Sequence, residues 1–494
     1  MCQLCIESSL STWERNEATA PGVLSTSTNK TVWNNSQVIS QLDSGYHWSG
    51  STITYSLPTN ANWFPYSEAN GFSAFNATQR AAANSAIELW DDLIAVSFTQ
   101  TTNASTSDIE FSNTTTNISY AHAYYPGGWS GAGSIWLNDN YTSLSDPDLG
   151  EYGFMTVLHE LGHALGLDHA GDYNGGSPTY QNDASHAQDS TMYTVMSYFG
   201  SENTGADWRF SDGSYAYAQT PMVHDILAIQ DMYGADQTTR SGNTVYGFNS
   251  NAGNDIFDFN INQHPVLTIW DGGGTDTINL SGYSDASIVD LRPGSYSDVF
   301  GAVNNLAIAY GAWIENAIGG SGDDRLTGHQ FANTLRGLGG YDTLRGLGGN
   351  DVLLGGGGND SVYGHNGRDR LVGHSGADKL YGGNDRDTLN GGSHNDRLHG
   401  GGGNDRLIGG LGNDTLIGGG DADTFVFNKS SWGDDVINDF QNGSDKISMR
   451  GSGFKAGDLH VVNSNGDAIV DFGNGDTITL LGEAGNIESS DFIF

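Results

Sequence analysis

The spacing of apolar residues predicts strands and helices in the first half of the chain. Residues 51–58, STITYSLP, alternate apolar and polar positions, which is typical of a half-buried strand. Residues 76–96 repeat apolar residues at helical spacing, and Asn76 stands at the N-cap position. The same patterns predict strands at 109–111 and 134–139 and helices at 156–167 and 222–233. Strands, helices and then a repeat array favour an α+β domain followed by a second, different domain.

The second half of the chain repeats with a nine-residue period that begins at residue 319. Each unit has a glycine, an aspartate position five residues later and an apolar residue two positions beyond, from Leu326 to Phe425. Twelve units stay in phase, which a flexible glycine linker would not do. The aspartates of the repeat are Asp324, Asp342, Asp351, Asp360, Asp369, Asp378, Asp387, Asp396, Asp405, Asp414 and Asp423.

Elementary geometry predicts that six residues of this unit turn the chain and three form a short strand with one apolar side chain pointing inward. Glycine permits the positive φ angles of such a turn. Stacked turns bring together carbonyls and carboxylates from residues two repeats apart, and these are the hard oxygen ligands that Ca²⁺ prefers. Rows of carboxylates repel without the ion, so we expect the array to fold only when calcium binds. The glycines expected among the ligands are Gly346, Gly348, Gly355 and Gly357.

The repeat resembles the calcium-binding RTX parallel β-roll, with a few departures. Phe331 replaces a turn glycine and Asn333 replaces the aspartate of the same unit, so we expect that turn to bind calcium weakly or not at all. Three other positions where glycine is usual hold Asp385, His394 and Asp421.

Length and charge add constraints. A chain of 494 residues favours two or more cores. The net charge of −39 would repel nucleic acid and anionic membranes, and calcium is the expected counter-charge. The two cysteines are Cys2 and Cys5, so no disulfide links the body of the protein. The sequence contains no apolar run long enough to predict a membrane span. The N-terminal twenty residues lack the pattern of an ordinary secretory signal.

The stretch HELGHALGLDH is the strongest chemical signal in the chain. His159 and His163 are four residues apart and share one helix face, as two ligands of one metal must. Gly166 allows the helix to stop and turn, which brings His169 in as a third ligand. Three imidazoles leave an open fourth position, which is typical of catalytic zinc. Glu160 would take a proton from the water that attacks a carbonyl.

A methionine turn follows this motif. TVMSYF contains Met196, expected as a soft apolar floor for the histidines. The extended H-E-x-x-H-x-x-G-x-x-H motif with such a turn is the metzincin pattern. With the RTX repeats, the chain resembles the serralysins, bacterial RTX-bearing metzincin endopeptidases, over nearly everything after about residue 33. In that family the tyrosine two residues after the methionine, here Tyr198, is a fifth zinc ligand that swings out to stabilise the transition-state oxyanion.

The resemblance also implies roles outside the zinc motif. Residues 134–138, SIWLN, resemble the edge strand of the cleft, where a peptide substrate adds as an extended strand. The terminal DFIF, residues 491–494, resembles the signal read by type I (ABC) exporters. Trp313 replaces a family threonine, a change that a main-chain calcium ligand would survive. The calcium ligands implied in the linker are Arg240, Gly242, Thr244, Asp271, Gly273, Asp276 and Glu315.

Residues 1–32 are interpreted as a leader or propeptide. Cys2 and Cys5 in this segment leave three hypotheses open: a leader that is simply removed, a local disulfide, or a thiolate that blocks the open metal position.

The predicted fold is an α+β metzincin catalytic domain at 33–245 followed by an all-β calcium-binding parallel β-roll (RTX) at 246–494, with a C-terminal β cap and secretion signal. The predicted function is that of a secreted, monomeric zinc endopeptidase with one catalytic zinc and several structural calcium ions. Its expected partners are protein substrates and a type I secretion apparatus, without nucleic acid or membrane. The alternative is a calcium-dependent extracellular binding or matrix protein with an inactive metzincin fold, and the intact ligand set favours the enzyme.

Overall fold

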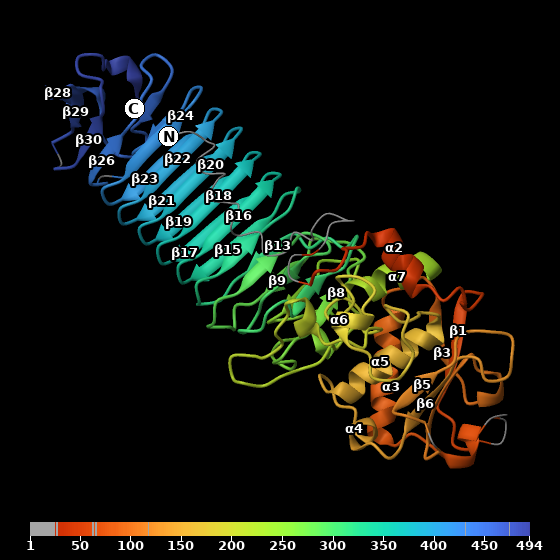
Figure 1. The fold of residues 1–494 in the computed structure, drawn as a ribbon. Coiled ribbons are helices and arrows are strands. Elements are labelled where there is room, and N and C mark those ends of the chain that lie inside the picture. The colour runs from red at the N-terminus through yellow and green to blue at the C-terminus, as the bar shows by residue number, and fades with distance from the viewer. Residues whose placement is uncertain are drawn as a thin grey trace.

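The structure is a computed structural model that describes residue 25 and residues 28–494, except residues 62, 63, 65, 66, 117, 430 and 474. Cys2 and Cys5 lie outside the described residues, and the hypotheses about them stay predictions. Figure 1 shows an N-terminal domain of helices around a sheet, from which a long stack of strands extends. Within the described part of the chain, no helix combines the length and apolar character that crossing a membrane requires.

The N-terminal domain is built on a mostly parallel sheet with the strand order β3-β1-β4-β6-β5. The segment SIWLN forms β6, and its expected place at the sheet edge is wrong. The antiparallel strand β5 pairs with β6, with Ala121 opposite Leu137, and occupies the edge. The strands of this sheet are β1 (Thr52–Ser56), β2 (Phe72–Ser73, which pairs with β4), β3 (Ser97–Gln100), β4 (Ile109–Thr114), β5 (Ala121–Ala123) and β6 (Ser134–Asn138).

The two long helices of this domain follow the local signals in the sequence. In α3 (Ala77–Asp91), the Asn76 side chain accepts from the Gln79 amide at 3.0 Å, and the Gln79 side chain accepts from the Asn76 amide at 2.9 Å. α5 (Tyr152–Leu165) ends at Gly166, whose φ of 110° is left-handed. The other α-helices are α2 (Asn35–Leu42), α4 (Thr142–Ser145), α6 (Tyr180–Asp183) and α7 (Val223–Tyr233). The 3-10 helices are η2 (Ser67–Gly71), η3 (Ala104–Thr106), η4 (Ser201–Thr204), η5 (Asp255–Phe257), η6 (Ala456–Asp458) and η7 (Ser489–Asp491).

Two eleven-stranded sheets share the repeats of the second domain, each taking alternate strands. The first, in spatial order, contains β10 (Ile288–Asp290), β14 (Arg325–Thr327), β16 (Thr343–Gly348), β18 (Ser361–Asn366), β20 (Lys379–Asn384), β22 (Arg397–Gly402), β24 (Thr415–Gly419), β26 (Asp434–Ile437), β30 (Thr477–Leu480), β29 (Asp467–Asp471) and β28 (His460–Ser464). The second contains β31 (Phe492–Ile493), β27 (Lys446–Ser448), β25 (Thr424–Val426), β23 (Arg406–Leu411), β21 (Thr388–Ser393), β19 (Arg370–Ser375), β17 (Val352–Gly357), β15 (Thr334–Gly339), β13 (Asn316–Ile318), β9 (Thr277–Asn279) and β7 (Val245–Gly247).

The predicted parallel β-roll with a C-terminal β cap is confirmed. Neighbouring strands of one sheet pair in parallel two repeats apart, as in Leu344 opposite Val362. The inward apolar residues from Leu326 to Phe425 are buried. At the far end, β28, β29 and β30 form an antiparallel meander (Figure 1). Most repeat strands span six residues rather than the expected three, because glycine positions of the turn also join the ladder, as in Leu338 opposite Gly356.

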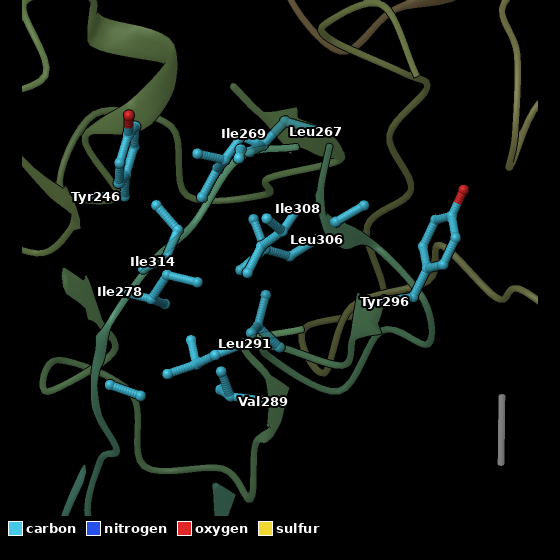
Figure 2. Close-up of a cluster of buried hydrophobic side chains, with 14 of the residues drawn as sticks. Tyr246, Leu267, Ile269, Ile278, Val289, Leu291, Tyr296, Leu306, Ile308 and Ile314 are labelled. Carbon is cyan, nitrogen blue, oxygen red and sulfur yellow. The ribbon is translucent and has the colours of Figure 1, made fainter. Parts of the chain in front are cut away.

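One continuous apolar core runs from the N-terminal domain into the roll. Figure 2 shows its part at the start of the second domain, where Ile278, Val289 and Leu291 lie together. At the margin, the hydroxyl of Tyr296 donates to the carbonyl of Met192 at 2.8 Å and so ties the two domains together. A separate sheet in this region consists of β11 (Tyr296–Ser297), β12 (Leu306–Ile308) and β8 (Leu267–Ile269).

Candidate metal centres

Three histidine rings converge at the C-terminal end of α5. His159 and His163 lie one turn apart on the helix, and the chain reversal at Gly166 brings His169 beside them. One ring nitrogen of each histidine lies within 4.8 Å of one nitrogen of each of the others. The Nε2 atoms of His163 and His169 are 3.1 Å apart. The structure therefore brings together the three ligands predicted from the sequence.

Main-chain carbonyls hold the outer nitrogens of two of these rings. Nδ1 of His159 donates to the Val195 carbonyl and Nδ1 of His163 to the Leu167 carbonyl, each at 2.7 Å. The inner Nε2 atoms are then unprotonated. Burial, together with the neighbouring histidines, lowers the pKa of all three rings to about 3. Three neutral imidazoles around one point fit a zinc ion with an open fourth position.

Glu160 presents an unsatisfied carboxylate oxygen next to the histidines. The side chain is buried, and its Oε2 atom has no hydrogen-bond partner. Burial raises the pKa of Glu160 to about 8. A buried polar atom without a partner is costly, and here a water at the metal centre would satisfy it. This environment fits the general base predicted for Glu160.

The turn that carries Met196 packs directly against α5. Met196 is fully buried, and its Sδ atom would lie 2.7 Å from a Cβ atom placed on Gly162. The turn and the helix can approach this closely only because residue 162 is glycine. The same turn supplies the Val195 carbonyl that holds His159. Met196 therefore lies against the helix that carries His159 and His163, and its role as a floor for the metal ligands stays a prediction.

Tyr198 lies on the open side of the centre. Its side chain is 41% exposed, while the three histidines are mostly covered. The centroid of its ring is 4.6 Å from that of His169 and 6.0 Å from that of His159. Tyr198 therefore lies beside the histidine cluster on its solvent side, and its roles as zinc ligand and oxyanion donor stay predictions.

Asp225 is a site residue that the sequence analysis missed. Its buried carboxylate accepts from the Val195 amide at 2.8 Å and from the Thr194 hydroxyl at 2.5 Å. It also accepts from the Met222 amide at 2.8 Å, as the third residue of α7. Asp225 thus holds the amide of Val195, the residue whose carbonyl orients His159. The position of Asp225 near the start of α7 predicts a helix-capping role. Nothing in the neighbouring sequence indicates that it also binds the amide of Val195.

The linker residues predicted to bind calcium also come together. Asp276 accepts from the Thr244 amide at 2.7 Å through one oxygen, and its other oxygen is buried without a partner. Burial, with Asp271 and Glu315 nearby, raises the pKa of Asp276 to about 7. The guanidinium of Arg240 forms an ion pair with Asp92. The group of Arg240 that can bind calcium is therefore its main-chain carbonyl. Hydrogen bonds connect Arg240, Gly242, Thr244, Asp276 and Glu315, and connect Asp271 with Gly273.

In the repeat array, each aspartate from Asp342 to Asp423 uses one oxygen on the backbone and leaves the other without a partner. Its Oδ1 atom accepts from the amide two repeats earlier at 2.7–2.9 Å. Its Oδ2 atom is buried and unbonded. Burial raises the pKa of Asp351 to about 7 and that of Asp387 to about 8. Rows of unsatisfied carboxylate oxygens fit bound calcium.

The first units of the array differ from the rest. Both oxygens of Asp324 accept backbone hydrogen bonds, from Ser287 at 2.7 Å and Gly320 at 2.5 Å. Asn333 satisfies its own side chain, because its Nδ2 atom donates to the Glu315 carbonyl and its Oδ1 atom accepts from the His329 amide, both at 2.8 Å. Weak calcium binding by this unit stays a prediction.

Three of the four departures from the glycine pattern keep the turn geometry, and Phe331 is the exception, because its φ is not positive. Asp385, His394 and Asp421 have φ angles of 74°, 80° and 74°, the left-handed region that glycine would adopt. The strain of about 1 kcal/mol at each is tolerated within the stack.

Two further aspartates extend the array beyond its periodic part and were missed. The amide of Asp414 donates to Asp435 at 2.7 Å, and the amide of Asp423 donates to Asp445 at 3.0 Å. Their separations of 21 and 22 residues depart from the regular 18, so a search for a nine-residue period does not find them.

A matched pair of glycine variants tests the calcium sites. A Cβ atom on Gly346 would lie 2.0 Å from the free oxygen of Asp351, whereas one on Gly348 would meet no atom closer than 3.6 Å. We expect Gly346→Ala to raise the calcium concentration at half-maximal folding by about tenfold, through displacement of a carboxylate ligand. Gly348→Ala should change it little. Calcium titration followed by circular dichroism measures both, and equal shifts in the two variants would contradict this account.

The family model described as Matrixin matches residues 47–197, and the model described as Peptidase M10 serralysin C terminal matches residues 235–481. Metallopeptidase AprA of Pseudomonas marginalis is 42% identical over 295 residues, which cover 58% of this chain and 61% of the relative. Serralysin C of Dickeya chrysanthemi is 44% identical over 266 residues, 52% of this chain and 54% of the relative. The matched region thus spans about three fifths of the curated relatives or less.

Proposed function

The chain belongs to the serralysin family, and from that membership we propose that it is a secreted zinc endopeptidase whose second domain is stabilised by calcium. The observation that carries the proposal is the cluster of His159, His163 and His169 beside a buried, unsatisfied Glu160. Zinc held by the three histidines would polarise a water and a substrate carbonyl. The substrates proposed are proteins and peptides.

Different residues of this chain carry out proton transfer, oxyanion stabilisation and substrate binding in peptide hydrolysis. Glu160 takes a proton from the attacking water and later passes it to the leaving amine. Tyr198 donates its hydroxyl to the oxyanion that develops on the carbonyl. The exposed edge of β5 is the proposed place where the peptide adds as an antiparallel strand.

Tyr198→Phe tests the role of the tyrosine. We expect kcat to fall by roughly 10²-fold with little change in KM, the scale of losing one oxyanion donor. Steady-state kinetics on a fluorogenic peptide, together with measured zinc content, check this. A change mainly in KM would instead make Tyr198 a substrate-binding residue.

The decisive test of the proposed function is hydrolysis of casein by the purified full chain. The proposal requires hydrolysis that a zinc chelator abolishes and that added zinc restores. No hydrolysis by protein loaded with zinc and calcium, after removal of the leader, would favour the alternative of a calcium-dependent matrix protein. The intact histidines and Glu160 support the enzyme.

Secretion and maturation are part of the same proposal. We infer export through a type I apparatus that reads the C-terminal residues, where β31 pairs with β27. Removal of the leader before activity is also proposed. The described end of this segment contacts the catalytic domain, since Lys30 donates to the Ala184 carbonyl at 2.7 Å and the Thr31 carbonyl accepts from the Ala187 amide at 2.9 Å.

A further inference from the structure

A second buried carboxylate, Asp189, lies beside the methionine turn and has no part in the chemistry described so far. It is fully buried. Its Oδ1 atom accepts from the hydroxyls of Tyr173 and Ser197, each at 2.7 Å. Its Oδ2 atom accepts from the Ser185 amide at 3.3 Å. A carboxylate held by three protein donors is a rigid anchor in the interior.

Tyr173 connects this anchor to Tyr198. The Tyr173 hydroxyl, which donates to Asp189, also accepts from the amide of Tyr198 at 3.4 Å. Its ring lies 5.0 Å from that of Tyr198 and 5.6 Å from that of His169, between centroids. Ser197, the residue before Tyr198, is bound to the same carboxylate. Asp189 is therefore linked to both residues of the Ser197–Tyr198 peptide, directly through the Ser197 hydroxyl and through Tyr173 to the Tyr198 amide.

We propose that Tyr173 is a positioning residue for Tyr198, with Asp189 as its support. A fixed main chain at residue 198 lets the exposed phenol turn about a constant pivot, so that its hydroxyl reaches the developing oxyanion at the same place in every turnover. Such placement matters because small errors in the position of a donor cost much of its effect. The inference rests on the proposed role of Tyr198 and goes beyond it by naming the residues that hold it.

Tyr173→Phe removes only the hydroxyl. Tyr173 is buried, and its hydroxyl donates to Asp189. The hydrogen bond between the His169 ring and residue 173 involves the main chain, which phenylalanine retains. We expect zinc content and KM to be unchanged and kcat to fall by about tenfold, less than when the Tyr198 hydroxyl is lost.

Tyr180→Phe is a matched control in the same loop region. The Tyr180 hydroxyl donates to the Ala187 carbonyl at 2.7 Å, so this variant also loses one hydroxyl bond. Its ring packs against Phe199 at 5.5 Å between centroids. Because this hydroxyl does not bind Asp189 or the amide of Tyr198, we expect kcat of the control to stay near that of the unmodified protein.

A double-mutant cycle separates positioning from general damage to the structure. In the Tyr198→Phe background, Tyr173→Phe should have almost no further effect on kcat, because the group that it positions is absent. Equal effects in both backgrounds would overturn the inference while leaving the role of Tyr198 intact. Full activity of Tyr198→Phe alone would overturn that role and the inference with it.

Hydrogen exchange in the zinc-free protein provides a readout that does not depend on activity. Loss of the Tyr173 hydroxyl should speed exchange of the Tyr198 amide, measured by mass spectrometry on peptides from the methionine turn. Tyr180→Phe should leave this exchange unchanged. Equal exchange in the Tyr173 variant and the unmodified protein would also overturn the inference.

Discussion

Glu160→Gln is expected to bind zinc and fold normally while peptide hydrolysis falls by at least about 10³-fold. An amide of the same size fills the buried site but cannot take a proton from the attacking water. The three histidines and the carbonyls that orient them are unchanged. The measurements are kcat on a fluorogenic peptide and zinc content of the purified protein. Near-normal turnover with zinc bound would remove Glu160 from the mechanism.

Glu110→Gln is a matched control for this experiment. Glu110 lies on β4, is buried, and has one carboxylate oxygen without a partner, as Glu160 does. Burial raises its pKa to about 8, the same as for Glu160. Loss of this carboxylate should leave kcat unchanged, because it lies in the sheet and not in the histidine cluster. The comparison separates the loss of a base from the loss of any buried carboxylate.

Removal of calcium from the full chain at neutral pH is expected to unfold the repeat array. The buried, unpaired oxygens from Asp342 to Asp423 repel one another without a cation, and one apolar residue in nine makes a thin core. Circular dichroism and hydrogen exchange of peptides from 319–426 should show loss of β-structure in a calcium chelator with zinc kept saturating. An array that stays fully protected without calcium would contradict the proposed calcium dependence.

Without calcium, the folded array should become less stable as the pH rises. Burial raises the pKa of Asp351 to about 7 and that of Asp387 to about 8, whereas an unfolded aspartate titrates near about 3.9. The folded array therefore binds more protons, and its stability falls as the pH rises from about 4 through about 8. Protein depleted of calcium should show more β-structure at about pH 5 than at about pH 8. The reverse order would contradict the burial of these carboxylates.

The features that could be predicted from the sequence are those that depend on neighbours along the chain. The cap at Asn76 and the helix end at Gly166 follow from backbone groups within a few residues. The spacing of His159 and His163 places both on one helix face at any position in the fold. The β-roll could be predicted for the same reason. Each repeat contacts the next, and the period alone specifies which residues stack.

Other features depend on contacts between segments that are distant in sequence. β6 was expected at the sheet edge, but only the complete sheet shows that β5 covers it. Asp435 follows a loop of irregular length, so no period indicates its place in the carboxylate row. Asp225 reaches the methionine turn from a separate helix, and Asp189 supports Tyr198 through the side chain of Tyr173. Such buried carboxylates are positioned by packing and hydrogen bonds across the domain, for which the linear order of residues carries no signal.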